Sequence, residues 1–440
     1  MSKPARTLLK VLVDQRRWRY TDFERAFRRA AAQVLDEGSR NLTVSEAQFR
    51  RWTAGKVQTL PSPEACAVLE HLFGVGAAAL FDAPPSVAPE PAFNLEDEIA
   101  MTARDAQSEA ADAAAASLSD TTLDQLRDDV TTLARTYTNR APFDAFQRGR
   151  ELREEAETVR SRTQVPVQAQ ELLIVAGQAC AILATAAFDL GALDGAKRLC
   201  RSAALYGETA RFDPLRAFAG GTLAYIAYFS NQPREAARLA RQAQTLTGLG
   251  DVARRRLAAI EARAFGHLGD PVSAQRALDA SQADGQNVTD DLHDGVGGEF
   301  GFSMERLAMS NASTCLLLGD GDQAESSAMQ ALELAAGRPA ALRSARVVGG
   351  AAADLAAARL LRGDLGGAAD ALEQVWPVPR DQRATGLLTR TARVRRALTT
   401  ERFRGAAVAG ELGDRIEDFT QMAAQHQLGV GQGLVAALEG

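Results

Sequence analysis

The sequence feature that most constrains the fold is a helical-hairpin pattern that recurs five times after residue 180. Each copy has an apolar helical stretch, a turn, and a second helical stretch with alanine at a fixed place, as in AAFDLGALDGAKRLCRSA (186–203). The alanines are Ala196, Ala236, Ala274, Ala324 and Ala368, with spacings of 40, 38, 50 and 44 residues. One hairpin cannot bury its apolar face alone, so the copies are predicted to stack into a solenoid.

Small residues and turn residues within the copies support this prediction. A second small residue follows seven positions later in three copies, at Ala203, Ala243 and Ala331, where it would let two helices approach closely. The turns carry Gly191, Asn231, Gly269, Gly319 and Gly363, and glycine and asparagine suit the left-handed conformation at a helix end. The stretches 118–160 and 385–427 lack the full pattern and are expected to form outer repeats. The spacing exceeds the 34 residues of a standard tetratricopeptide unit.

Composition extends the helical prediction to the whole chain. Alanine, the best helix former, is abundant after residue 100, and aromatic residues make up only 6% of the 440 residues. A chain of that length is too long for a single hydrophobic core and is typical of several domains or of a repeat array. The segment 82–95 contains four prolines and reads as a linker. The expected organisation is a domain at 1–81, the linker at 82–95 and a helical repeat domain at 96–440.

Charge is distributed unevenly between these parts. Residues 1–81 contain 13 Lys and Arg against 8 Asp and Glu, whereas the remainder contains 37 against 48. A basic first domain on an acidic body indicates a polyanionic partner for the first domain alone. The sequence shows no basic start followed by an apolar run, and no apolar stretch of about 18 residues. It therefore predicts a cytoplasmic protein without membrane association.

The most informative local stretch is LTVSEAQFRRWTAGKVQTLPSP (42–63). Ser45 with Gln48 three residues later forms a capping-box pattern, and Val44 with Phe49 has the spacing of a hydrophobic staple. A cap at Thr43 is the alternative. The pattern predicts a helix at about 45–54 that packs through Phe49 and Trp52 and leaves its arginines exposed.

The pattern S-E-x-x-Φ-x-R-W-x-x-G-K from residue 45, followed by L-x-x-L-F-G-V at 69–75, resembles the phage-repressor type of helix-turn-helix. With the repeats, the chain resembles actinobacterial helix-turn-helix transcriptional regulators with a C-terminal tetratricopeptide-like domain. More distantly, it resembles the peptide-pheromone-receptor regulators of Gram-positive bacteria. The resemblance implies an all-α fold and a sequence-specific regulator that binds double-stranded operator DNA as a homodimer. Its repeat domain would bind a peptide or small-molecule effector, mediate dimerisation, or both.

The resemblance also implies roles for single residues. Glu46, Ala47 and Arg51 occupy positions that face base edges, and arginine is the usual bidentate reader of guanine. Ser45, Arg50 and Lys56 occupy positions that contact phosphate, whereas Gln48 fits a cap partner better than a base reader. The chain departs from the family in two ways. Some nine residues separate the expected second helix (about 21–35) from the third, in place of a turn of three or four, and Thr53 replaces an acidic residue.

Candidates for an effector site come from the rarity of aromatic residues. Three tyrosines lie between 206 and 228, and the candidates are Tyr206, Tyr225, Tyr228 and Asn311. Ordinary packing between repeats is the alternative interpretation. A second function class, a protein-interaction scaffold with a vestigial helix-turn-helix, also remains open.

The segment SQADGQNVTDDLHDGVGGEFGFS (281–303) is rich in Gly and Asp. It is expected to be a long, solvated loop, although its carboxylates leave a metal-dependent enzyme as a third alternative. The chain contains no nucleotide-binding or hydrolase motif. Its four cysteines, Cys66, Cys180, Cys200 and Cys315, form no CxxC pair. The chain is therefore expected not to be an enzyme, with no catalytic residues, metal site or cofactor.

Overall fold

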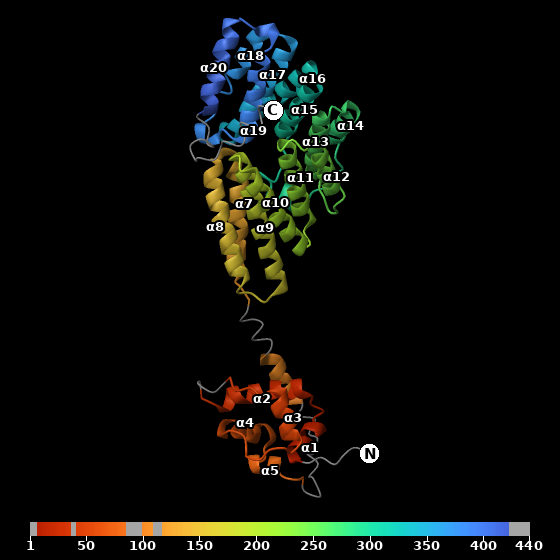
Figure 1. Cartoon of the computed structure of the whole chain (residues 1–440), viewed down its shortest axis with the longest axis vertical. Helices are drawn as coiled ribbons and strands as arrows, with labels where there is room; N and C mark the ends of the chain where they lie inside the picture. Colours follow the sequence, from red (N-terminus) through yellow and green to blue (C-terminus); the bar gives the residue numbers. More distant parts are fainter. Residues whose placement is uncertain (1–6, 37–40, 85–98, 109–116, 422–440) are drawn as a thin grey trace. The chain divides into compact units, whose positions relative to one another are not determined.

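The computed structural model describes residues 7–36, 41–84, 99–108 and 117–421, and all regular secondary structure within these ranges is helical. The prediction of an all-α protein is confirmed. Contacts divide the chain into two compact units, Met1–Asp105 and Ala106–Gly440 (Figure 1). Most of the predicted linker at 82–95 lies outside the described residues.

The first unit contains the helices α1 (Leu8–Gln15), α2 (Tyr20–Val34), α3 (Glu46–Thr53), α4 (Pro63–Phe73) and α5 (Ala77–Phe81). Its core is aromatic, because Phe23 and Phe27 of α2 are fully buried and Trp52 of α3 is nearly so. The bounds of α4 follow from local chemistry. Pro63 opens the helix behind a Ser62 cap, and Gly74 ends it with a φ of 66°.

The second unit consists of consecutive helical hairpins, in which most helices pack on the helices before and after them in the chain (Figure 1). The helices are α7 (Asp120–Thr136), α8 (Pro142–Arg160), α9 (Pro166–Asp189), α10 (Leu193–Thr209), α11 (Asp213–Phe229), α12 (Pro233–Gln244), α13 (Asp251–Leu268), α14 (Pro271–Gln282), α15 (Met304–Leu318), α16 (Gly321–Ala336), α17 (Ala345–Arg362), α18 (Leu365–Leu372), α19 (Thr385–Leu398) and α20 (Ala407–Gln421). A short 3-10 helix, η1 (Tyr137–Asn139), follows α7.

The five predicted hairpins are all present, from α9–α10 to α17–α18. The alanine at the fixed place is fully buried in every copy, since its exposure is 0% at 196, 236, 274, 324 and 368. The five turn residues all have positive φ, from 55° at Asn231 to 90° at Gly363. Alanine therefore lies where two helices pack closely, and a residue in the left-handed conformation lies at each turn between the two helices of a hairpin.

Helix α9 is long and apolar enough, by length and composition, to cross a membrane. This differs from the prediction that no stretch reaches that length, because scattered glutamines interrupt the apolar run without making the helix polar. Its most apolar window is 78% buried within the second unit. Such burial is expected of a helix that packs against others on several sides.

The last helices of the second unit return to its first ones. Helix α17 packs on η1, and α19 packs on α9. The Arg346 guanidinium contacts Asp189 Oδ2 at 2.6 Å and also donates to the backbone oxygens of Tyr137 and Thr138. The Thr385 hydroxyl donates to the backbone oxygen of Asp189 at 3.1 Å. We call these the closure contacts, because they join segments up to 209 residues apart and enclose the interior of the unit.

The segment 281–303 is only in part the solvated loop that its composition predicts. Residues 282–289 are exposed, as expected, whereas several residues from 290 onward are buried. Leu292 and Phe300 are fully buried, and the Phe300 ring packs edge-on against Phe218 at 4.9 Å. The Glu299 amide donates to the backbone oxygen of Ala134 in α7 at 2.8 Å. The later part of the segment, which includes a π-helical turn at Asp291–Val296, therefore packs between α7, α11 and α13.

Candidate functional site

Helix α3 begins as the sequence predicts. Ser45 is the N-cap, and its hydroxyl accepts a hydrogen bond from the Gln48 amide at 3.3 Å. Gln48 Oε1 accepts in return from the Ser45 amide at 2.9 Å. The capping box is therefore confirmed with Ser45 as the cap, and the alternative at Thr43 is wrong. Gln48 serves as the cap partner.

Aromatic contacts hold α3 against α2. The Phe49 ring lies 4.8 Å from that of Phe23, and the Trp52 ring lies 6.2 Å from that of Phe27. The Tyr20 hydroxyl donates to the backbone oxygen of Val44 at 2.9 Å, just before α3 begins. These contacts fix the orientation of α3 even though eleven residues, 35–45, separate it from the end of α2.

The residues that the sequence singles out on this helix lie on its solvent-facing side. Ser45, Glu46, Ala47, Arg50, Arg51 and Lys56 are exposed, and Gln48 is half-buried. Glu46 and Arg50 form an ion pair at 2.5 Å within the helix. Arg51 and Lys56 have no side-chain hydrogen bond or ion pair with any residue that the structure describes. Their charges are therefore available to a partner.

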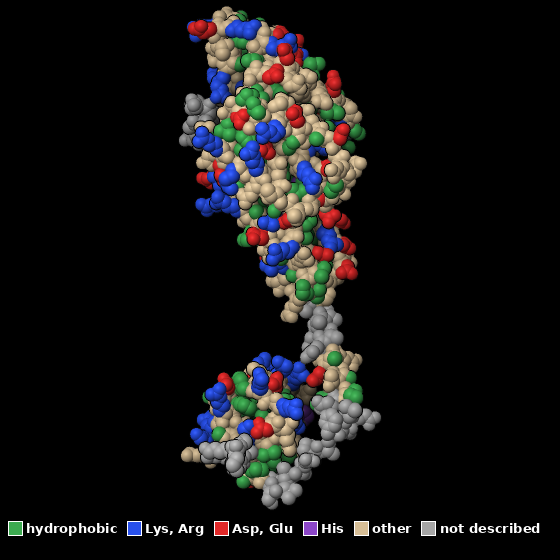
Figure 2. Space-filling model, turned by 90° about the vertical axis from the view of Figure 1, so that its right-hand side faces the viewer, with side chains coloured by type: hydrophobic (Ala, Val, Ile, Leu, Met, Phe, Trp, Pro, Cys, Tyr) green, Lys and Arg blue, Asp and Glu red, His purple; other side chains and the backbone are tan. Residues whose placement is uncertain are grey.

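A basic groove on α2 was not predicted from the sequence. It is lined by Tyr20, Thr21, Glu24, Arg25, Arg28, Arg29, Ala32 and Asn41. Its three arginines are exposed, and Figure 2 shows Lys and Arg side chains gathered on the visible face of the first unit. Arginines three and four residues apart on a helix share one face, so the spacing of Arg25, Arg28 and Arg29 was a signal for this groove.

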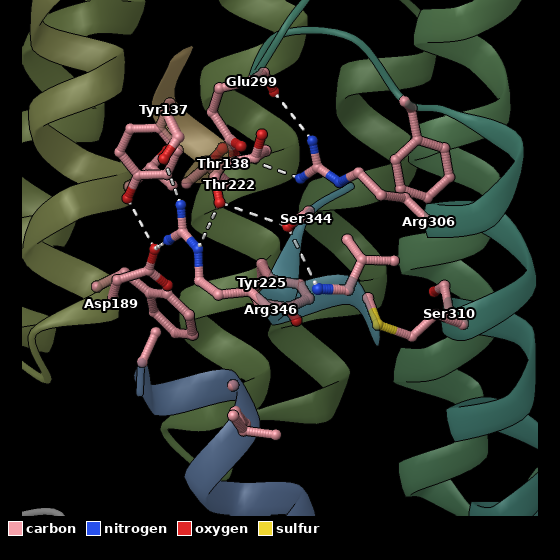
Figure 3. A pocket seen from close by; sticks show the side chains of 18 of the residues that line it. Tyr137, Thr138, Asp189, Thr222, Tyr225, Glu299, Arg306, Ser310, Ser344 and Arg346 are labelled. Atoms are coloured by element: carbon pink, nitrogen blue, oxygen red, sulfur yellow. Dashed lines mark hydrogen bonds and ion pairs between the residues drawn. The ribbon is translucent and has the colours of Figure 1, made fainter. Parts of the chain in front are cut away.

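The interior of the second unit contains a cavity of about 180 Å³. Every first helix of a hairpin from α9 to α17 contributes to it, together with α19, η1 and the segment 281–303. Figure 3 shows Arg346 between Tyr137 and Asp189 on one side, and Arg306 beside Glu299 on the other. The residues of the closure contacts form part of the wall, so the packing of α17 on η1 and of α19 on α9 helps to shape the cavity.

Arginines dominate the polar part of this wall. Five line the cavity, namely Arg256, Arg263, Arg306, Arg346 and Arg390, against two carboxylates, Asp189 and Glu299. Burial and the nearby charge of Arg306 lower the pKa of Arg256 to about 10. Burial raises the pKa of Asp189, although the charge of Arg346 opposes this effect. The cavity is thus lined by buried and half-buried side chains with an excess of positive charge.

Of the four effector candidates, only Tyr225 lines this cavity. The Tyr206 hydroxyl donates to Glu157 at 2.7 Å, between α8 and α10. Tyr228 packs edge-on against His267, with ring centroids 4.1 Å apart. Asn311 is buried in α15, where its side-chain oxygen has no hydrogen-bond partner among the described residues. Packing therefore accounts for Tyr206 and Tyr228.

Two carboxylates of the segment 281–303, those of Asp290 and Asp294, accept hydrogen bonds from backbone amides. Asp290 accepts hydrogen bonds from the amides of Leu292, His293 and Gly250. Asp294 accepts from the Asp290 amide at 3.0 Å. Among the described residues, which include all of 281–303, no three His, Cys, Asp or Glu residues come together as a metal site. These acids stabilise the turn, and the metal-dependent alternative receives no support from them.

A scan against protein-family models finds no match to this chain. A search of curated proteins finds no significant relative.

Proposed function

We propose that this chain is a transcriptional regulator that binds operator DNA through its first unit. In this proposal the first unit is a helix-turn-helix of the phage-repressor type, and α3 is its recognition helix. The observation that carries the proposal is the division of α3 into two faces. Phe49 and Trp52 fix the helix against α2, while Glu46, Ala47 and Arg51 remain exposed.

The exposed residues match the chemistry of DNA. A guanidinium without a protein partner can donate two parallel hydrogen bonds to guanine, and this pair is worth about 1–3 kcal/mol of discrimination. The amides at the start of α3, Lys56 and the arginines of the α2 groove supply phosphate contacts. Such regulators bind as dimers to half-sites about one helical turn apart, and we propose a homodimer here as well.

The second unit is proposed to be a tetratricopeptide-like solenoid that binds an effector in its cavity, mediates dimerisation, or does both. The cavity supports this role because its wall contains residues from both ends of the repeat array. A molecule bound there can change the closure contacts and, through them, the geometry of the dimer. This describes a sensor that acts on DNA binding, with no catalytic step.

The test begins with genome-wide footprinting to identify the operator. Fluorescence anisotropy then compares the operator with a scrambled duplex of the same length. Arg51→Ala is expected to weaken operator binding roughly tenfold or more and to leave scrambled-duplex binding nearly unchanged. Arg104→Ala, an exposed arginine of the same unit, makes the same change of charge and should have no effect. Unchanged operator affinity in Arg51→Ala would contradict the assignment of α3.

Salt dependence separates the regulator from the scaffold. If Arg25 contacts a phosphate, Arg25→Ala should weaken binding to both duplexes equally. It should also lower the slope of log affinity against log salt by about 1. A wild-type protein without any salt-dependent affinity for DNA would instead favour the interaction scaffold.

A further inference from the structure

The arginines that line the cavity of the second unit are not all paired with carboxylates. Three of its five arginines have a carboxylate partner. Arg346 pairs with Asp189 at 2.6 Å, Arg390 with Asp354 at 2.9 Å, and Arg306 with Glu299 at 3.3 Å. The other two, Arg256 and Arg263, form no ion pair within 4.0 Å with any residue in the described part of the chain.

Arg256 is 7% exposed and is held in place by neutral groups. Its guanidinium donates to the Thr222 hydroxyl at 2.9 Å and to the backbone oxygen of Phe218 at 3.3 Å, and it lies over the Phe218 ring at 4.2 Å. A Cβ at Gly221 would lie 2.5 Å from Arg256 Nη1. Glycine at that position therefore gives the guanidinium its room inside the unit.

Arg263 lies two helical turns further along α13, so both arginines occupy the same face. Its side chain is 3% exposed, and Nη1 donates to the Tyr225 hydroxyl at 3.0 Å. Its Nε is buried without a hydrogen-bond partner among the described residues. A buried donor without a partner is costly to the folded state, so Nε indicates an acceptor that binds from the cavity.

We propose that this cavity binds a small organic anion whose carboxylate or phosphate group pairs with Arg256 and Arg263. Buried charges are normally compensated, and a planar guanidinium matches the oxygens of a carboxylate or phosphate in bidentate geometry. Within the proposed function, this anion is the effector. Its role as effector rests on the proposed regulation of DNA binding, whereas the anion site itself does not.

The rest of the wall limits the size and polarity of the ligand. Ile260, Met309 and Leu387 provide an apolar surface beside the arginines. A cavity of about 150 Å³ accommodates benzene, and this one has about 180 Å³. The ligand is thus a compact molecule with one anionic group and an apolar part. This volume favours a small molecule over a peptide effector.

Benzoate and benzamide provide a matched pair of probes, since they share a shape and differ in charge. Calorimetric titration and thermal melting use the full chain at constant ionic strength. Benzoate is expected to bind and to raise the melting temperature, and benzamide is expected to do neither. Phenyl phosphate and inorganic phosphate distinguish a carboxylate ligand from a phosphate ligand. Binding of benzamide as tight as that of benzoate, or no response to any of the three anions, would overturn the proposal.

Variants then test the two arginines. Arg256→Gln and Arg263→Gln are each expected to raise the Kd of the bound anion roughly tenfold or more. Arg238→Gln, an exposed arginine on α12, should retain the wild-type Kd. If the glutamine variants fail to fold, Arg263→Lys serves in their place. This variant keeps the charge and loses the planar guanidinium, so it should bind the anion with intermediate affinity. An unchanged Kd in folded variants would refute the assignment.

Operator affinity is measured on the same preparations with and without benzoate. Anion binding that leaves DNA affinity unchanged would support the site and contradict its role as the effector site. Conversely, if the protein does not bind operator DNA, the calorimetric evidence for the anion site is unaffected. The two proposals can therefore fail separately.

Discussion

Substitution of Arg346 by alanine should destabilise the second unit, because this side chain makes three of the closure contacts. The guanidinium contacts Asp189 at 2.6 Å and donates to two backbone oxygens, of Tyr137 and Thr138. Both members of the ion pair are only 13% exposed. Removal of one partner of a buried pair costs about 3–5 kcal/mol. Asp189 keeps its hydrogen bond from the Tyr137 hydroxyl, so we expect the lower end, about 3 kcal/mol.

A change of this size is visible in a melting experiment. One kcal/mol shifts the melting temperature by about 2–4 °C in a domain of 150–250 residues and by less in a larger one. Arg346→Ala should therefore lower the calorimetric transition of the second unit by roughly 5 °C. Hydrogen exchange should also become faster in η1 and at the start of α17. The control is Arg238→Ala, whose ion pair with Glu235 is exposed, and which should melt like the wild type.

Two outcomes would refute this reasoning. The first is an Arg346→Ala protein that melts and exchanges like the wild type. The second is a double-mutant cycle with Asp189→Ala in which the two effects simply add, because residues in direct contact should show a coupling of about 0.5–3 kcal/mol. Either result would mean that the closure contacts form without stabilising the unit.

Two other predictions concern the interior of the second unit and the thiols. Gly298 has a φ of 60°, and a Cβ there would lie 2.4 Å from the backbone oxygen of Ala134. Gly298→Ala should therefore lower the melting temperature more than Gly405→Ala, where φ is also positive but no atom lies within 4 Å. Burial raises the pKa of the thiols of Cys180 and Cys315 to about 11 and that of Cys200 to about 12. At pH 8 an absorbance assay with a thiol reagent should detect one reactive cysteine, Cys66, in the native protein and four after unfolding. Rapid reaction of all four in the native state would contradict this burial.

Structural features that depend only on residues close together in the sequence were predictable from it. The left-handed turns at Gly191 and Asn231 follow from the residue types, and the alanine at each fixed place follows from the close approach of two helices. The capping box at Ser45 is equally local, because both partners lie within one helical turn. The sequence therefore indicated the hairpins and the start of α3.

The interior of the second unit was less predictable, because it depends on which segments meet. Acids and glycines in 281–303 suggested a solvent-exposed loop, which is correct for 282–289. Further along, however, Asp290 and Asp294 accept hydrogen bonds from backbone amides, and Leu292 and Phe300 are fully buried. These two side chains were the available signal. Similarly, Arg256 and Arg263 stand seven residues apart on an otherwise apolar face of α13. Nothing local indicates that Arg346 pairs with Asp189, which lies 157 residues away.

The closure contacts also affect how the second unit folds. In an open repeat array, each repeat contacts only its neighbours, so the array can begin to fold anywhere and fray from its ends. Here η1 and α9 depend on residues 344–385, which a ribosome produces some two hundred residues later. Contacts so distant in sequence slow folding. The early hairpins must therefore persist with an exposed inner face until the last ones are made, and the cavity is completed only when synthesis of the unit is nearly finished.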